Sequence, residues 1–299
     1  MQHRSSEIAG SRVRIVYAVE LNFEVIAPTD FIFNIHASRT PQQSVTGESF
    51  VTTPAVPVRV DDDPTFGNRL GRLHAEPGPL NVRYAATADV SHYTSEPSLL
   101  FAVPPAELPP AVLRYLRPSR YCQSDRVSSL AWQQFGHLAP GYEQAQAVCT
   151  WVRQRTRFQP GTSGVNTSAL DTLDAGVGVC RDFAHAAISL LRALNYPTRI
   201  VTGVDYGADP GLGPPDFHCY LDVFLGDRWY LFDPTGICPL TGLIRIATGS
   251  DAADVSFATT FGQVRGTMPK LSFTAVEDVA AGIMLPYPTS LAISTVSVL

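Results

Sequence analysis

The chain has 299 residues, of which 45% are hydrophobic and 16% charged, with 24 prolines and a net charge of −5. This length and composition suggest two domains with ample cores, built from many short strands and turns. The small negative charge gives no reason to expect binding to nucleic acid or to an anionic membrane surface.

The cysteines and the absence of long apolar runs bear on location. Five cysteines occur, and none lies in a C-x-x-C pair or in another spacing typical of a metal site. This odd number favours a reducing, cytoplasmic compartment over a disulfide scaffold. Residues 1–7 lack the apolar core of a secretory signal, and no apolar run reaches the ~18–20 residues of a membrane span. We therefore expect no membrane association.

Alternating apolar residues predict strands in the first 105 residues. The stretch Arg12–Val25 alternates between apolar and polar positions, as one strand or a hairpin does. Shorter apolar runs, bounded by turn-forming residues, follow at 31–35, 49–51, 55–60, 80–85 and 99–101. We therefore expect a β-sandwich-like domain over residues 1–105, with its boundary at the prolines of residues 104–110.

Three aspartates, Asp61–Asp63, lie in one turn of this expected domain. Neighbouring carboxylates can coordinate calcium, but a solvated turn is the more common role of such a run. His36, His74 and His92 are scattered along the same part of the chain, and the sequence assigns them no role.

The second part, residues 106–299, opens with helical patterns and ends with short strand patterns. Helices are expected at 111–116, 127–135 and 142–158, and strands or turns that close the domain at 199–204, 241–246, 251–258 and 270–273. Cys149 falls on the apolar face of the third helix, so we expect it, and Cys122, in the core. The pattern predicts an α+β domain over residues 106–299.

The stretch around Cys180 organises this second domain. Gly176 and Gly178 precede Cys180, and from there apolar residues recur with a 3.6-residue period until Pro197. Cys180 is therefore expected in the first turn of a buried helix, where free backbone N–H groups and the helix dipole stabilise a thiolate. A cysteine at this position is a candidate nucleophile, and a cysteine that only packs is an equally frequent alternative.

A histidine and an aspartate follow on two predicted strands. Apolar runs that contain His218 and Asp233 flank Gly226-Asp227, which predicts a two-residue hairpin turn with Leu225 opposite Arg228. In that register His218 and Asp233 share one face as diagonal neighbours, roughly 7–8 Å apart at the backbone. A carboxylate there can orient an imidazole, whereas a three-residue turn would place the two side chains on opposite faces.

Each of these residues also has a simpler explanation. Cys180 could pack in the core, His218 could be a half-buried strand residue, and Asp233 before Pro234 could open a turn. Together they supply the nucleophile, the proton acceptor and the orienting carboxylate of cysteine catalysis, so the joint pattern favours a nucleophilic site. His185 is nearer in sequence, but its place on the helix turns it away from Cys180.

These residues carry a resemblance to a known family. Residues 178–184 (GVCRDFA), the strand that begins near His218, and residues 232–235 (FDPT) resemble the transglutaminase-like superfamily. Within it, the chain is most similar to bacterial members described as transglutaminase-like enzymes or as candidate cysteine proteases. Residues 116–122, the helix through Trp151 and the β-rich N-terminal half resemble the same group, so the resemblance covers most of the chain.

The resemblance implies a papain-like α+β core in which Cys180 is the nucleophile, His218 the general base and acid, and Asp233 the orienting carboxylate. It implies acyl transfer on carboxamide or peptide bonds of a peptide or protein substrate, through a thioester and without a cofactor or metal. Hydrolysis is the expected outcome. Transfer to an amine, as in a protein-glutamine transglutaminase, and a non-catalytic interaction scaffold that keeps the fold are the alternatives. The sequence does not determine the oligomeric state.

Three details of the expected site stay open. The family commonly reads His-Ala-Trp where this chain has His218-Cys219-Tyr220, and Cys219 is expected to face away from His218. The backbone N–H of Cys180 is expected to be one oxyanion donor, with Gln159 or Asn166 as weaker candidates. The loop 206–216, rich in glycine and proline, leads to His218 and is either a lid or a plain connector.

Overall fold

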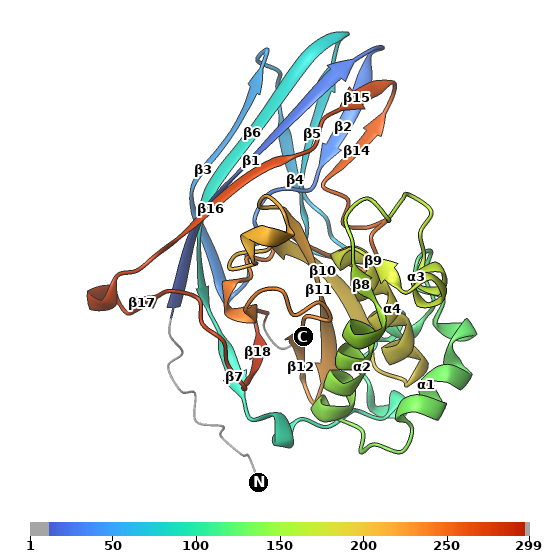
Figure 1. Cartoon of the computed structure of the whole chain (residues 1–299). Coiled ribbons are helices and arrows are strands. Elements are labelled where there is room, and N and C mark those ends of the chain that lie inside the picture. The colour runs from blue at the N-terminus through green and yellow to red at the C-terminus, as the bar shows by residue number, and fades with distance from the viewer. Residues whose placement is uncertain (1–11, 297–299) are drawn as a thin grey trace.

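The computed structural model describes residues 12–296, and the expectation about residues 1–7 lies outside them (Figure 1). The described chain forms two facing β-sheets, built mainly from its N-terminal part, and a group of α-helices packed on a third sheet. A β-rich part followed by an α+β part is the fold class expected from the sequence. Among residues 12–296, no helix combines the length and the apolar content needed to cross a membrane.

The elements have the following bounds. The α-helices are α1 (Ser128–Phe135), α2 (Tyr142–Arg155), α3 (Ala169–Ala175) and α4 (Cys180–Ala193). The first strands are β1 (Arg12–Val25), β2 (Thr29–Phe33), β3 (Gln43–Thr53), β4 (Arg59–Asp62), β5 (Arg69–Ala75), β6 (Gly78–Ser91) and β7 (Tyr93–Ser95). Among and after the helices lie β8 (Arg157–Phe158), β9 (Val177–Gly178), β10 (Thr198–Val204), β11 (Phe217–Leu225), β12 (Arg228–Phe232) and β13 (Ala247–Gly249). The last strands are β14 (Ala258–Phe261), β15 (Val264–Gly266), β16 (Lys270–Val276), β17 (Ile283–Met284) and β18 (Ala292–Ser294).

Two sheets make a sandwich in the N-terminal part. One has the order β15-β1-β6-β3, with β16 and β17 also paired to β1, and the other has the order β14-β2-β5-β4. Successive positions of β1 alternate between buried and less buried, and apolar side chains occupy the buried ones, so one face of the strand lies in the core. Aromatic side chains join the sheets: the ring of Phe23 on β1 lies 5.1 Å from Phe31 and 6.0 Å from Phe33 on β2, between centroids.

The C-terminal strands return to this sandwich. β16 pairs antiparallel with β1 from Arg14 opposite Val276 to Glu20 opposite Lys270, and β14 pairs with β2. The expectation that residues 270–273 close the second domain was therefore wrong, because β1 offers a backbone edge whose N–H and C=O groups β16 satisfies. The domain boundary at residue 105 remains a prediction, because strands from the C-terminal part of the chain pair with strands from the N-terminal part.

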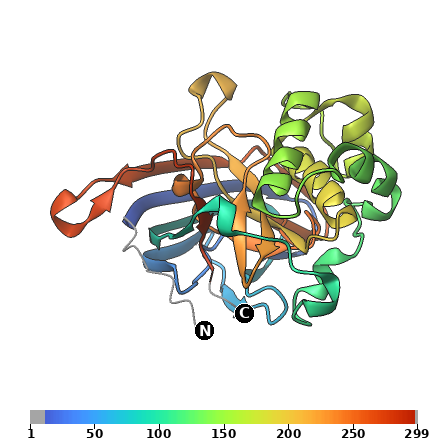
Figure 2. The ribbon, with the colours of Figure 1, turned by 90° about the horizontal axis from the view of Figure 1, so that it is seen from below.

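The helices cover one face of the third sheet, which belongs to the α+β part of the chain. This sheet is antiparallel, with the order β12-β11-β10-β13, and α4 packs directly on β10 and β11. Figure 2 shows the helices on one side of this sheet and the N-terminal strands on the other. Every helical position from Asp182 to Arg192 is buried, so α4 is enclosed as its apolar pattern predicted.

Some local predictions differ from the structure. Residues 99–101 were expected as a strand, but Leu99 ends a 3₁₀ turn that begins at Pro97, and Phe101 forms only an isolated bridge with Gly141. Proline fixes φ and favours the start of such a helical turn. Residues 241–246 were expected among the closing strands and turns, and they begin in the 3₁₀ turn Leu240–Gly242, after which the next strand is β13. The sequence patterns did not predict β5 or α3.

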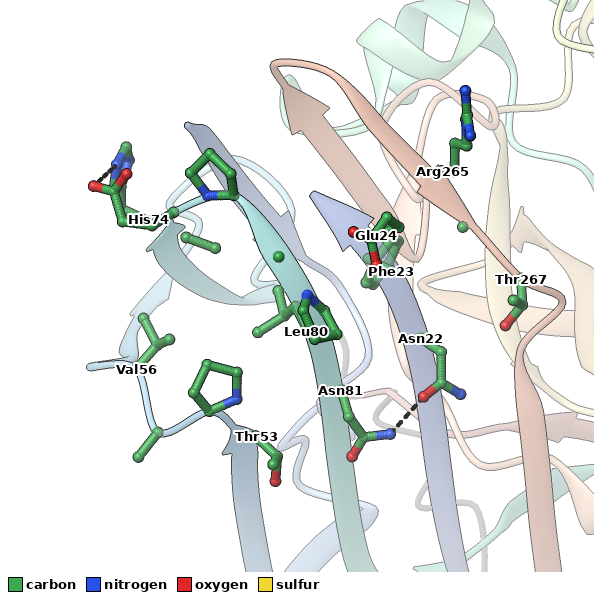
Figure 3. A pocket seen from close by; sticks show the side chains of 18 of the residues that line it. Asn22, Phe23, Glu24, Thr53, Val56, His74, Leu80, Asn81, Arg265 and Thr267 are labelled. Carbon is green, nitrogen blue, oxygen red and sulfur yellow. Dashed lines mark hydrogen bonds and ion pairs between the residues drawn. The ribbon is translucent and has the colours of Figure 1, made fainter. Parts of the chain in front are cut away.

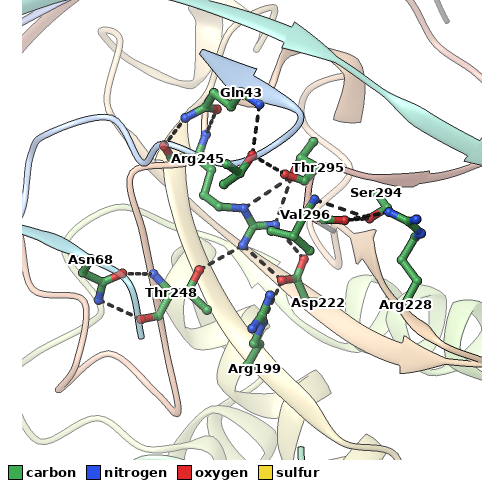
Figure 4. A network of polar contacts seen from close by, with 11 residues as sticks. Gln43, Asn68, Arg199, Asp222, Arg228, Arg245, Thr248, Ser294, Thr295 and Val296 are labelled. Atoms are coloured by element: carbon green, nitrogen blue, oxygen red, sulfur yellow. Dashed lines mark hydrogen bonds and ion pairs between the residues drawn. The ribbon is translucent and has the colours of Figure 1, made fainter. Parts of the chain in front are cut away.

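A buried polar network joins the two parts (Figure 4). The guanidinium of Arg245, 2% exposed, donates to both oxygens of Asp222, at 2.9 and 3.0 Å, and to Thr248 and Thr295. The backbone of Arg245 is held by the side-chain amide of Gln43 on β3, which both donates to it and accepts from it. Asn68 makes the same two-way contact with the backbone of Thr248. These bonds fix the third sheet against the sandwich.

Candidate active site

The start of α4 places Cys180 in the first helical turn, as the sequence predicted. Val179 is extended, and its N–H donates to Oδ2 of Asp182 at 2.9 Å, which satisfies one of the free donors at the helix start. Gly178 lies so close to this carboxylate that a Cβ added there would be 2.7 Å from Cβ of Asp182. A glycine at 178 therefore permits the close approach that fixes the beginning of the helix.

The loop before α3 is tied to the same helix start. Ser163 donates to Oδ1 of Asp182 at 2.8 Å, and Arg181 donates to Ser163 and to the carbonyl of Gly164, both at 2.6 Å. Phe158 on β8 pairs with Gly178 on β9, which brings the beginning of this loop beside Cys180. These contacts hold the loop next to Cys180.

The hairpin of β11 and β12 has the predicted two-residue turn. Leu225 pairs with Arg228, and Gly226 has a φ of +60°, the left-handed conformation that such turns require. The pairing continues to Leu221 opposite Phe232, so Asp233 follows at the strand end on the side of His218. Nε2 of His218 lies 3.3 Å from Oδ2 of Asp233, and both side chains are buried.

Thr235 orients the carboxylate of Asp233. Its backbone N–H and its hydroxyl both donate to Oδ1, at 2.8 and 2.6 Å, and the hydroxyl oxygen lies 3.4 Å from Nε2 of His218. The Asp-Pro-Thr segment thus forms a tight local turn around the carboxylate. The sequence analysis did not single out Thr235, although the frequent bonding of an aspartate to the backbone two residues later is a signal that could have found it.

Cys180 lies against the beginning of β11, where Sγ is 3.9 Å from the carbonyl oxygen of Phe217. A hydrogen bond from Cys219 and the neighbouring His218 lower the pKa of Cys180 well below that of a free thiol, against the opposing effect of burial. Burial disfavours the charged form of His218, but the negative charges of Asp233 and Cys180 raise its pKa well above the ordinary value. The arrangement therefore favours a thiolate beside an imidazolium.

Cys219 contributes more than the sequence suggested. It follows His218 on β11 and was expected only to change the pocket wall, on the face away from the histidine. Its thiol is a hydrogen-bonding partner of Cys180, and this contact, together with burial, raises the pKa of Cys219 well above that of a free thiol. Cys219 thus remains protonated and donates to the Cys180 thiolate. Only the packing of α4 on β11 reveals this role.

The other candidates from the sequence are structural. His185 is buried and stacks on Tyr121 with a centroid distance of 5.1 Å, and burial lowers the pKa of His185 to about 3. Cys122 and Cys149 are buried, and burial raises the pKa of Cys122 to about 12. In the aspartate run, Asp61 forms ion pairs with arginines and Asp63 accepts from the backbone of its own turn.

The predictions for the oxyanion donor and the loop stay predictions. Gln159 is half-buried and Asn166 is exposed, and no described contact connects either side chain to Cys180. The backbone N–H of Cys180 lies in the first turn of α4, where the helix provides no acceptor for it. The loop 206–216 is largely exposed and contains a short 3₁₀ turn at Pro210–Leu212.

Two further features can hold ligands. His218, Asp233 and Cys238 bring one nitrogen, one oxygen and one sulfur within 4.8 Å of one another. A separate, mainly apolar pocket of about 1040 Å³ lies at the end of the sandwich, between the ends of β1 and β6 and the turns beside them (Figure 3). None of Cys180, His218 and Asp233 lines that pocket, so it is distinct from the candidate active site.

Two family models match this chain. One, described as the transglutaminase-like superfamily, covers residues 129–234, and the other, described as the bacterial transglutaminase N-terminal domain, covers residues 14–111. Cys180, His218 and Asp233 all lie within the first of these ranges. The two matches fall on the α+β part and on the sandwich, respectively.

Several known proteins are similar to the chain. A crystal structure from Cytophaga hutchinsonii, described as a "putative cysteine protease", shares 33% sequence identity with a TM-score of 0.89, over 96% of this chain and 99% of that one. The uncharacterized protein ML0607 of Mycobacterium leprae is 33% identical over 150 residues, which are 47% of this chain and about half (52%) of that protein. The uncharacterized protein Rv2569c of Mycobacterium tuberculosis is 24% identical over 298 residues, 91% of this chain and 92% of that protein.

Proposed function

Because the chain belongs to the transglutaminase-like superfamily, we propose that it is a cysteine-dependent acyl-transfer enzyme with Cys180, His218 and Asp233 as its catalytic triad. The observation that carries this proposal is the 3.3 Å pair of His218 and Asp233 beside a thiol whose pKa is lowered. Fold membership supports acyl transfer by a cysteine in general, and the roles of the individual residues rest on this geometry.

The proposed reaction begins with the Cys180 thiolate. Its sulfur attacks the carbonyl carbon of an amide, and the resulting oxyanion is stabilised by backbone N–H groups, among them that of Cys180. The His218 imidazolium gives its proton to the departing amine nitrogen as the C–N bond breaks, which leaves a thioester. Asp233 holds the imidazole in place and favours its charged form throughout.

In the second half of the reaction, His218 takes a proton from the attacking group. When that group is water, the C–S bond breaks, a carboxylic acid leaves and the thiolate is restored. When it is an amine, a new amide forms. We propose hydrolysis of a peptide or isopeptide-like amide, because the similar Cytophaga protein is described as a "putative cysteine protease" and matches over 96% of this chain. The odd number of cysteines supports a reducing, cytoplasmic compartment for this reaction. Transfer to an amine uses the same groups and is the alternative.

Alkylation of the cysteines tests the triad without knowledge of the substrate. Each thiol is labelled with iodoacetamide from mildly acidic to mildly basic pH, and the rates are obtained by mass spectrometry of the peptides. We expect Cys180 to react fastest, already well below the free-thiol pKa of about 8.5. The change His218→Ala should slow its labelling in acid at least tenfold, because the thiolate loses its cationic partner.

The matched control is His74→Ala, which removes an exposed histidine on β5. It should leave the labelling of Cys180 unchanged. A Cys180 that reacts no faster than the half-buried Cys238, or that ignores the loss of His218, contradicts the enzymatic function and favours a binding scaffold. For an active protein, glutamine-containing peptides with and without an added amine then distinguish acid products from amine adducts.

A further inference from the structure

Cys238 is a third cysteine near the candidate active site, and the proposed reaction does not use it. It follows β12 in the loop that begins with Asp233, and its side chain is half-buried. Sγ lies 3.3 Å from the hydroxyl oxygen of Tyr220, and the ring of Tyr220 packs against His218 with a centroid distance of 4.5 Å. The thiol is therefore held beside the His218–Asp233 pair.

We propose that His218, Asp233 and Cys238 form a binding site for Zn²⁺, and that zinc bound there inhibits the enzyme. Imidazole nitrogen, carboxylate oxygen and thiolate sulfur are the three ligand types that proteins use for zinc. Here one atom of each type lies within 4.8 Å of the other two. The site goes beyond the proposed function, since metal binding does not require Cys180, whereas inhibition rests on that function.

The distances fit tetrahedral coordination. Nε2 of His218 and Oδ2 of Asp233 are 3.3 Å apart, and two ligands at about 2.0 Å from a tetrahedral zinc ion are separated by about 3.3 Å. A sulfur ligand at about 2.3 Å needs to be about 3.6 Å from the other two atoms. Because Sγ of Cys238 is within 4.8 Å of them, it needs to approach by no more than about 1.2 Å, which a side-chain rotation in a loop can supply.

Asp233 presents an oxygen for this purpose. Asp233 as a whole residue is only 8% exposed. The backbone N–H and the hydroxyl of Thr235 both donate to Oδ1, so Oδ2 accepts neither of them. Oδ2 is buried and faces Nε2 of His218 at ion-pair distance, and no other residue in the range 12–296 is placed to donate to it. A zinc ion between these two atoms would replace the proton that lies between the imidazolium and the carboxylate.

Zinc would inhibit because it binds Nε2 of His218. On binding, the Cys238 thiol proton and the Nε2 proton of His218 are released to solvent, and the metal takes their places. The imidazole then cannot become the imidazolium that gives a proton to the departing amine. Three protein ligands leave a fourth position for water, so the ion can enter and leave without unfolding the loop.

Cobalt, which reports tetrahedral thiolate coordination by its absorption spectrum, tests the site directly. The full chain with Cys180→Ala is titrated with Co²⁺, so that the nucleophile cannot supply the sulfur. We expect one equivalent to bind with a thiolate-to-cobalt charge-transfer band, and zinc to displace it. Adding Cys238→Ala should abolish the band and weaken zinc binding at least tenfold by calorimetry. Cys219→Ala in the same background is the matched control and should keep the band.

The second measurement concerns inhibition. In the chain with Cys180 intact, zinc should slow iodoacetamide labelling of Cys180, and each variant is compared with its own metal-free rate. We expect the slowing to disappear in Cys238→Ala. Cys238→Ser, which keeps a hydroxyl next to Tyr220, replaces Cys238→Ala if circular dichroism shows that the alanine variant is unfolded.

Two results would overturn the proposal. A charge-transfer band that survives Cys238→Ala but is lost in Cys219→Ala would place the metal on the other side of Cys180. Equal slowing by zinc in wild type and in Cys238→Ala would show that zinc binds the nucleophile itself. Because cobalt binding is measured without Cys180, failure of the metal site and failure of the proposed enzymatic function give different results.

Discussion

Cys180 has two neighbours that favour its thiolate, and they act in different ways. His218 contributes a positive charge, whereas Cys219 contributes only a hydrogen bond from a neutral thiol. The thiol of Cys219 therefore adds a hydrogen-bond donor at Sγ of Cys180. This residue should affect the acidity of the nucleophile without taking part in proton transfer.

The change Cys219→Ala should raise the pKa of Cys180. Loss of a donor destabilises the thiolate relative to the thiol, so the pH profile of Cys180 alkylation should move to higher pH. Cys219→Ser keeps a donor and should largely restore the wild-type profile. If both variants behave as wild type, Cys219 only fills space.

Asp233 should control the acidity of His218. In Asp233→Asn the pKa of His218 should fall by at least one unit, because the charge that stabilises its imidazolium is lost. The measurement is an NMR titration of the histidine ring. Asp30→Asn is the control, because Asp30 raises the pKa of the exposed His74 and should leave His218 unaffected. An unchanged His218 in Asp233→Asn would contradict the assigned orientation.

At this scale, the sequence predicted what a local pattern determines. The helix start locates Cys180, and the two-residue turn places His218 and Asp233 on one face. The contact of Thr235 with Asp233 is also local, since the two residues are two positions apart. The roles of Cys219 and Cys238 depend on how the start of α4 and the loop after β12 approach β11. That approach is a property of tertiary packing, which no spacing of residues along the chain encodes.

At the scale of elements, the start of α4 depends on the close contact between Gly178 and Asp182. Gly178→Ala should displace the Asp182 side chain, since the new Cβ would lie 2.7 Å from Cβ and 3.1 Å from Oδ2 of Asp182. We expect a loss of about 1–3 kcal/mol in the free energy of unfolding, typical of overpacking. Labelling of Cys180 should also become slower, because the first turn of the helix shifts.

A second glycine provides the matched control for this prediction. Gly164 lies in the neighbouring loop, and a Cβ there would meet only the hydroxyl of Thr167, at 3.9 Å. Gly164→Ala should therefore change neither the urea midpoint nor the rate of labelling. Equal effects of the two substitutions would show that the loop, and not the helix start, is sensitive to added bulk.

The predictability of elements followed the strength of their periodicity. β1, β11, β12 and α4 have long regular patterns, and all were predicted within a few residues. β5 and α3 are short, and each contains few apolar residues among polar ones, so the apolar pattern is weak. Only alternate positions of β5 are buried, and α3 buries only Ala169 and Thr172. A short pattern of this kind does not distinguish an element from a loop.

At the scale of the whole molecule, the Asp222–Arg245 pair supports the contact between the two parts. Asp222→Asn leaves the buried Arg245 and the half-buried Arg199 beside a neutral group, and should cost about 3–5 kcal/mol in the free energy of unfolding. Urea denaturation measures this change. Loss of the exposed Arg59–Asp61 pair through Arg59→Ala is the control and should have far less effect, since water screens it.

The Asp222–Arg245 pair also determines how the stability of the protein changes with pH. Burial opposes ionisation of Asp222, but the two arginines hold its pKa below the ordinary value. The pKa of Asp222 is lower in the folded than in the unfolded protein, so its ionisation stabilises the fold. This stabilisation is fully present above the pKa of Asp222 in the unfolded chain, about 3.9, and it is lost as the pH falls through the pKa in the folded protein. Wild type should therefore lose more stability than Asp222→Asn on acidification. Parallel losses would contradict this account.

The two-part organisation was foreseeable, because a proline-rich boundary separates a strand-rich composition from a helical one. The return of residues 258–284 to the sandwich was not. Short amphipathic strands carry no information about which edge they join, and β1 has a suitable edge far away in sequence.

This return has a consequence for synthesis. A ribosome makes the chain from its N-terminus, so β1 and β6 emerge long before β16, which pairs with the other edge of β1. Throughout that interval the nascent sandwich exposes an unpaired edge, a template for other chains. The segment with Cys180 is also made before the sandwich is complete. The order of translation thus differs from the order of assembly, and the last strands to be made complete the sheet that was begun first.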